Sequence, residues 1–167
     1  GESIVSIVSD SWDLFNAAEN IFGTELRELI EKKGEAGGRT VIRPDSGDPI
    51  ETNLQLIHIL VEKFGGTTNE AGFLVLPHYL RILQGDGMTE ESIEALLTAA
   101  AEAGYAAENW IFGMGGGLLQ RVDRDTEKFA AKCSQIKLIG SDGKEETRPV
   151  FKRPSTDPMK NSKQGEL

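Results

Sequence analysis

Cysteine, long apolar runs and net positive charge are all scarce in this sequence. Its 167 residues include one cysteine, Cys133, which excludes an internal disulfide framework and is typical of a reducing cytoplasm. No apolar run approaches the roughly 18 residues that cross a bilayer, and the first residues lack the basic start of a signal peptide. The net charge of −9 disfavours nucleic acid as a partner. We therefore expect a cytoplasmic protein that binds neither membranes nor nucleic acid.

The rest of the composition is that of an ordinary globular protein, with 38% hydrophobic and 27% charged residues. The charge is unevenly spread. Residues 1–112 carry 7 Lys and Arg against 19 Asp and Glu, whereas residues 113–167 carry 11 against 8. Such a basic third is either a solvated surface or a region that meets an anion such as phosphate, and charge alone favours the solvated surface.

A strand followed by a helix recurs about four times along the chain. Short apolar runs predict strands at about 3–9, 39–42, 80–84 and 109–113. Alternating units of this kind form parallel sheets with right-handed crossovers. Two α/β architectures fit, a doubly wound sheet and part of an irregular, incomplete βα (TIM-like) barrel. In both, ligands bind beyond the carboxyl ends of the strands.

Helix starts are marked by polar capping residues. Asp10 and Ser11 are expected to cap a helix that reaches Phe22, and Thr24 to cap the next. Asp48, followed by Pro49, gives the clearest start. Its helix carries apolar residues four and three positions apart, which predict the buried face: Ile50, Leu54, Ile57, Val61 and Phe64.

The pattern changes after the fourth unit. The segments "FAAKCSQIKLIG" and "KEETRPVFKRP", joined across residues 141–143, predict a β-hairpin, and the polar end of the chain is expected to be extended. We divide the chain into half of a βα-barrel catalytic domain (1–128), a hairpin extension (129–153) and a polar tail (154–167). Because four βα units are half of a full barrel, we expect a fragment of a larger enzyme.

Each predicted strand ends in residues suited to polar chemistry. They are Asp10; Arg43 and Asp45; Gly85 and Asp86; and Gly113, Gly115, Gly116 and Gly117. One aspartate after a strand routinely caps a helix, but four successive exits of this kind predict one shared site. Glycines let backbone N–H groups approach a phosphate, and Arg124 could add a bidentate hydrogen-bonded contact to it. The structural alternatives are a flexible glycine turn, aspartates that cap turns, and an ion pair of Arg43 with Asp10 or Asp45.

The histidines give no sign of a metal centre. His58 flanks the apolar face of its helix and His78 follows Pro77 in a loop, so neither has the spacing of a metal ligand. Both are expected to be structural. The sequence predicts no metal site built from protein side chains alone.

The polar strand exits, taken in order, resemble the nicotinamide phosphoribosyltransferase family. The matching stretches are "IVSDSWDLFNA", "VIRPDSGDP", "LRILQGDG", "IFGMGGGLLQRVDRD", "AAKCS" and "VFKRPSTDPMKNSKQGEL". The resemblance runs essentially from end to end with similar spacing. It implies an incomplete βα barrel joined to a second domain, and a homodimer whose active sites lie at the subunit interface.

The resemblance implies a pentosyltransferase reaction of NAD biosynthesis. Nicotinamide and phosphoribosyl pyrophosphate give nicotinamide mononucleotide and pyrophosphate, with Mg²⁺ and with ATP as an activator. The family's catalytic histidine would lie upstream of position 1, and neither histidine of this chain matches it. We therefore expect the isolated chain to be inactive.

Two exits carry most of the residues that match the family's site. Arg43 and Asp45 match the pair that meets the nicotinamide ring, the ribose and the pyrophosphate, and both are expected to be catalytic. Gly85 and Asp86 match contacts to the ribose hydroxyls. Asp10, also expected to be catalytic, matches an aspartate beside the catalytic histidine.

The phosphate side of the site matches residues further along the chain. Gly115, Gly116 and Arg124 are expected at the 5′-phosphate, with the arginine reaching across from the partner subunit. Lys132, and more weakly Lys152 and Lys160, match residues at the phosphate entrance. Three positions depart from the family pattern: Trp12 for tyrosine, Met114 for serine, and Ala130 for a phosphate-contacting serine.

Two other functions stay open at this point. A nicotinate phosphoribosyltransferase is one, because the residues that choose between amide and acid are not in this sequence. The other is a non-catalytic half-domain that binds sugar phosphates or nucleotides. It would bind phosphate or a mononucleotide without turnover.

Overall fold

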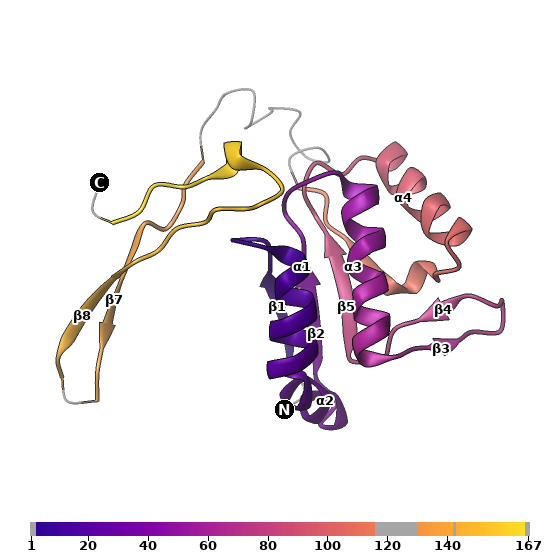
Figure 1. Cartoon of the computed structure of the whole chain (residues 1–167), viewed down its shortest axis with the longest axis horizontal. Helices are drawn as coiled ribbons and strands as arrows, with labels where there is room; N and C mark the ends of the chain where they lie inside the picture. Colours follow the sequence, from indigo (N-terminus) through magenta and orange to yellow (C-terminus); the bar gives the residue numbers. More distant parts are fainter. Residues whose placement is uncertain (1–2, 116–129, 142, 166–167) are drawn as a thin grey trace.

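The structure is a computed structural model that describes residues 3–115, 130–141 and 143–165. Its centre is a sheet of four parallel strands that lie side by side in chain order (Figure 1). They are β1 (Ile4–Val8), β2 (Arg39–Arg43), β5 (Leu80–Gln84) and β6 (Trp110–Phe112). Helices fill the crossovers that parallel neighbours require. The α/β class and the parallel sheet predicted from the sequence are confirmed.

Three crossovers connect the strands. From β1 to β2 the chain forms α1 (Leu14–Asn16), the π-helix η1 (Ala17–Glu25) and α2 (Arg27–Glu35). From β2 to β5 it forms α3 (Pro49–Phe64) and an unpredicted small hairpin, β3 (Thr67–Thr68) with β4 (Leu74–Val75). From β5 to β6 it forms α4 (Glu90–Glu102) and the 3₁₀ turn η2 (Ala107–Asn109).

The first helix was predicted to start at Asp10 and Ser11, which is two to three residues too early. Asp13 is the N-cap, and its Oδ1 accepts hydrogen bonds of 3.0 Å from the N–H groups of Phe15 and Asn16. Thr24 is also not a cap, because it lies inside η1 and its hydroxyl donates to the carbonyl of Glu19. In contrast, Asp48 caps α3 as predicted, accepting from the N–H groups two and three residues on.

The hydrophobic core lies between the helices and one face of the sheet. From the sheet it takes Ile42, Leu80, Ile82 and Trp110. From α3 it takes Leu56, Ile57, Leu60 and Phe64, so the buried face is rotated from the prediction, and Ile50, Leu54 and Val61 lie at its margin. The reason is that α3 packs between η1 and α4 as well as on β5, which buries a wider and shifted stripe.

A polar chain crosses this core below the carboxyl end of β5. Asn53 of α3 is fully buried; its Nδ2 donates to Gln84 Oε1 (2.8 Å), and its Oδ1 accepts from Trp110 Nε1 (3.0 Å). Gln84 Nε2 in turn donates to the carbonyl of Asp86 (3.3 Å). Buried polar groups are stable only when they are paired, so this series of hydrogen bonds holds α3, β5 and β6 in fixed positions relative to one another.

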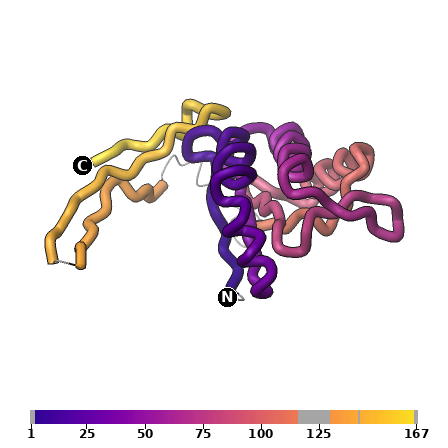
Figure 2. The backbone as a smooth tube through the Cα atoms, turned by 60° about the horizontal axis from the view of Figure 1, so that its bottom comes forward, coloured from indigo at the N-terminus to yellow at the C-terminus, as the bar shows by residue number. Residues whose placement is uncertain are grey.

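The C-terminal part forms the predicted hairpin and then returns to the sheet. Strands β7 (Gln135–Ile139) and β8 (Glu145–Pro149) pair antiparallel and project away from the helices (Figures 1 and 2). Residues 150–162, here called the strap, include the 3₁₀ turn η3 (Pro158–Lys160). The strap packs against the loop after β1 rather than forming a free tail, as Ser155 N–H donates to the Trp12 carbonyl (2.7 Å).

No described helix is long and apolar enough to span a membrane.

We predict that Asn53→Ala destabilises the protein by about 2–4 kcal/mol, because it leaves the Trp110 indole N–H and the Gln84 side-chain carbonyl buried without partners. Urea unfolding monitored by tryptophan fluorescence measures the loss. The matched control is Asn20→Ala, which removes an exposed asparagine and should change stability by about 0.5 kcal/mol or less. Equal effects of the two substitutions would contradict the role of the polar chain.

Candidate functional site

The site begins with a buried carboxylate at the exit of β1. Asp10 is 1% exposed, and its Oδ2 accepts hydrogen bonds from the backbone N–H of Asp45 (3.0 Å) and from the hydroxyl of Ser46. These donors belong to the turn after β2, so Asp10 ties two neighbouring strand exits together. Asp10 therefore does not cap a helix, because its carboxylate accepts hydrogen bonds from the turn after β2 instead.

The exit of β2 supplies a cation and a second carboxylate. Arg43 Nη2 lies 3.2 Å from Asp45 Oδ1, which is one of the ion pairs expected as a structural alternative. Asp45 Oδ2 also lies 3.6 Å from Lys152 Nζ of the strap. Asp45 therefore sits between two cations, with 23% of its side chain exposed.

The exit of β5 approaches the same place through glycines. A Cβ atom on Gly85 would lie 3.7 Å from Arg43 Nη2, and one on Gly113 would lie 3.3 Å from the Cα of Gly85. The contact at Gly113 is tight, so its missing side chain lets the exits of β5 and β6 come close together, whereas the spacing between Gly85 and Arg43 is ordinary van der Waals contact. Asp86 follows, and its carboxylate points toward the strap, where Oδ2 accepts from Lys160 Nζ (2.7 Å). We call Asp10, Arg43, Asp45, Ser46, Gly85 and Asp86 the rim cluster.

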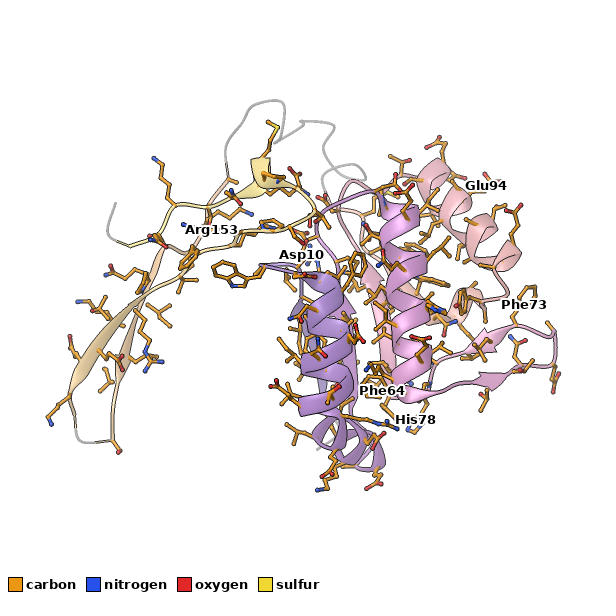
Figure 3. All side chains as sticks on the ribbon, viewed as in Figure 1. Asp10, Phe64, Phe73, His78, Glu94 and Arg153 are labelled. Carbon is orange, nitrogen blue, oxygen red and sulfur yellow. The ribbon has the colours of Figure 1, made fainter. Side chains whose placement is uncertain are left out.

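The strap borders one side of the rim cluster, and Figure 3 shows Arg153 of the strap and Asp10 of the cluster on these two segments. Arg153 N–H donates to the Ser11 carbonyl, and the Thr156 and Ser46 hydroxyls lie 2.7 Å apart. The rings of Trp12 and Phe151 meet edge to face with centroids 5.0 Å apart. Sequence reasoning missed the Ser46–Thr156 contact, because nothing in the spacing joins residues 110 positions apart.

Opposite charges balance within the described part of the site. Three carboxylates meet three cations: Asp10, Asp45 and Asp86, and Arg43, Lys152 and Lys160. Burial lowers the pKa of Lys160, but the hydrogen bond and charge of Asp86, with the charges of Asp45 and Asp157, outweigh it and raise this pKa above its ordinary value. The Lys160 ammonium is therefore charged at neutral pH, and its interaction is lost only as pH rises through that raised pKa.

Two buried polar atoms of the rim cluster have no hydrogen-bond partner among the described residues. They are Asp10 Oδ1, an acceptor, and Arg43 Nε, a donor. Such groups are rare in folded proteins because an unpaired buried polar atom costs free energy. They mark places where a further polar group, from a ligand or from more protein, fits the site.

The remaining predicted site residues are not part of this cluster as described. Gly115 is exposed and faces open space, and Lys132 is exposed with no described bond to the rim cluster. Gly116, Gly117 and Arg124 lie outside the described residues. Within the described ranges, no three His, Cys, Asp or Glu side chains gather to hold a metal. His58 is exposed beside Glu62, and His78 packs on Tyr79.

Comparison with known proteins identifies relatives over nearly the whole chain. Residues 2–167 match the model of the nicotinate phosphoribosyltransferase (NAPRTase) family. A nicotinamide phosphoribosyltransferase of Xanthomonas campestris pv. campestris is 47% identical over 165 residues, which is 99% of this chain and 33% of that protein. Those of Mycoplasma pneumoniae and Acinetobacter baylyi are 34% and 32% identical, over 95% and 98% of this chain and 36% and 35% of theirs. The chain thus spans about a third of the length of these relatives.

We predict that Asp10→Ala releases the turn after β2. Hydrogen exchange of the Asp45 amide should accelerate by roughly ten- to hundredfold, because a hydrogen bond to a charged acceptor contributes about 1.5–3 kcal/mol. NMR-detected exchange measures this. Amides of β5, such as Ile82, provide the internal reference; equal acceleration there would indicate global destabilisation and contradict the local role.

Proposed function

This chain belongs to the nicotinate phosphoribosyltransferase family, and we propose that it forms the ribose- and phosphate-binding part of a nicotinamide phosphoribosyltransferase. The reaction transfers the phosphoribosyl group of phosphoribosyl pyrophosphate to nicotinamide in NAD biosynthesis. The bond from C1′ to the pyrophosphate oxygen breaks, a bond from C1′ to the ring nitrogen forms, and pyrophosphate leaves with the electron pair. The supporting observation is the convergence of carboxylates and cations at the carboxyl ends of parallel strands.

The residue types at the rim cluster suit this displacement. Loss of pyrophosphate gives the anomeric carbon oxocarbenium character, which carboxylates nearby stabilise. Asp86 is assigned to the ribose hydroxyls and Asp45 to the reacting end of the sugar. Arg43 and Lys152, which flank Asp45, are assigned to the negative charge of the leaving pyrophosphate. The roles of Gly116 and Arg124 at the 5′-phosphate are proposed from the resemblance alone.

Magnesium is proposed to arrive with the pyrophosphate. Among the described residues, no group of three or more His, Cys, Asp or Glu side chains is placed so that it could hold a metal ion. Mg²⁺ commonly binds through substrate phosphates with one or two carboxylates and water, so Asp45 and Asp86 fit that limited role. The ion would neutralise the pyrophosphate charge when bound. The activation by ATP and the cytoplasmic location stay predictions.

The sheet itself supports a barrel for the whole protein. Its strands follow one another in chain order, with no reversal of the kind found in doubly wound sheets. The face away from the helices carries the exposed side chains of Ile4, Val8 and Ile111. A hollow of about 520 Å³ beside β1 is lined largely by apolar side chains, including Trp12 and Phe22. We propose that further strands cover these surfaces in a βα barrel, and that a homodimer completes the phosphate side.

We predict that Asp86→Ala, in the protein expressed from the complete coding sequence that includes this chain, lowers kcat/KM for phosphoribosyl pyrophosphate by roughly ten- to hundredfold. Its thermal midpoint should change by about 2 °C or less, because the side chain is partly exposed. Arg124→Ala should behave likewise. Glu94→Ala, on the exposed surface of α4, is the control and should alter neither quantity. Parallel losses of stability and activity would favour a purely structural role.

The choice of base is tested by the same protein with either nicotinamide or nicotinate as acceptor. We expect mononucleotide formation with nicotinamide, in keeping with the relatives' names. Preference for nicotinate would overturn the proposed substrate. Binding of ribose 5-phosphate without turnover of either base would instead favour the non-catalytic half-domain.

A further inference from the structure

Lys160 bridges two strand exits that belong to different βα units. Its Nζ donates to the backbone carbonyl of Asp45 (2.6 Å) and to Asp86 Oδ2 (2.7 Å). The first bond ends on the turn after β2 and the second on the turn after β5. One ammonium group thus links the backbone of the Asp45 turn to the carboxylate of Asp86.

The backbone around Lys160 is held in place by several hydrogen bonds. Asp157 is the N-cap of η3, and its side chain accepts from the Met159 N–H (3.0 Å). The residues on either side of η3 are tied down as well, by the Thr156–Ser46 contact and by Ser162 N–H, which donates to the Lys152 carbonyl (3.1 Å). Lys160 therefore reaches the site from a held segment, which limits the entropy lost in forming its two bonds.

The Asp86 turn has little else to fix its carboxylate. Gly85 and Gly87 flank it, and Gly87 has a φ of +62°, a region that glycine enters freely. The bond from Gln84 holds the backbone carbonyl of Asp86 and leaves its side chain free to rotate. In the described structure, Lys160 is the hydrogen-bond donor that the Asp86 carboxylate contacts.

We infer that Lys160 is a positioning residue, which holds Asp86 and the Asp45 turn in the geometry that receives the ribose of the substrate. This role rests on the proposed function. It differs from direct contact with a phosphate, the role suggested by the resemblance, because Lys160 then acts through Asp86. A double-substitution cycle separates the two.

The cycle uses Lys160→Met, Asp86→Asn and the double variant, in the protein expressed from the complete coding sequence. Each single substitution should raise KM for phosphoribosyl pyrophosphate by roughly ten- to hundredfold and leave kcat within about threefold, since a contact held throughout the reaction contributes to binding. The double variant should be no worse than the worse single variant. Multiplying effects would show direct phosphate contact and overturn the inference, as would a fall in kcat at unchanged KM.

Two controls separate positioning from folding. Lys163→Met removes an exposed lysine one residue beyond the strap that has no described bond, and should leave KM unchanged. Lys160→Arg, which keeps a cation able to bridge two acceptors, should recover part of the lost affinity. A rise in KM in Lys163→Met equal to that in Lys160→Met would indicate general disruption of this part of the chain and contradict the inference.

A ligand-free measurement keeps the test independent of the proposed function. The pKa of Lys160, followed by ¹³Cε NMR, should fall in Asp86→Asn because the carboxylate that raises it is gone. An unchanged pKa would show that the bridge does not form. A wild-type protein that lacks transferase activity but shows this fall would refute the proposed function and leave the Lys160–Asp86 pairing intact.

Discussion

The geometry of the site depends on one buried carboxylate that must be paired. Asp10 is shielded from water, so its charge is tolerable only if donors are held against it. The donors are the Asp45 N–H and the Ser46 hydroxyl, and their position dictates the path of the turn after β2. The same hydroxyl contacts Thr156, so the constraint extends from β1 through β2 to the strap.

The strap brings part of the basic C-terminal third of the sequence against the acidic part. An acidic N-terminal part and a basic C-terminal part meet where Lys152 and Lys160 approach Asp45 and Asp86. The interpretation of the basic third as a solvated surface is wrong for these lysines, whose side chains are 13% and 32% exposed. Without them the cluster would carry excess negative charge and would repel a phosphorylated ligand.

Local patterns were enough to predict most of the elements, but they could not predict contacts between residues far apart in the sequence. The strands and the cap at Asp48 follow from apolar runs and helix-start residues, which act within a few positions. The cap assigned to Asp10 failed because a partner 35 residues away competes for its carboxylate. The buried stripe of α3 shifted because neighbours on both sides, unseen in the periodicity, pack against it. It was predictable that the exits of β1, β2 and β5 meet, because parallel strands end at one edge of the sheet. It was not predictable that the strap packs against them.

We propose that three strand exits and the strap form a single receptor for a phosphorylated pentose. Titration of the ¹⁵N-labelled chain with ribose 5-phosphate, followed by amide NMR shifts, tests this most directly. We predict that the amides of Asp45, Gly85, Asp86 and Lys160 shift along one saturation curve with a common Kd. Shifts confined to the β7–β8 hairpin, or separate saturation curves for these amides, would contradict it.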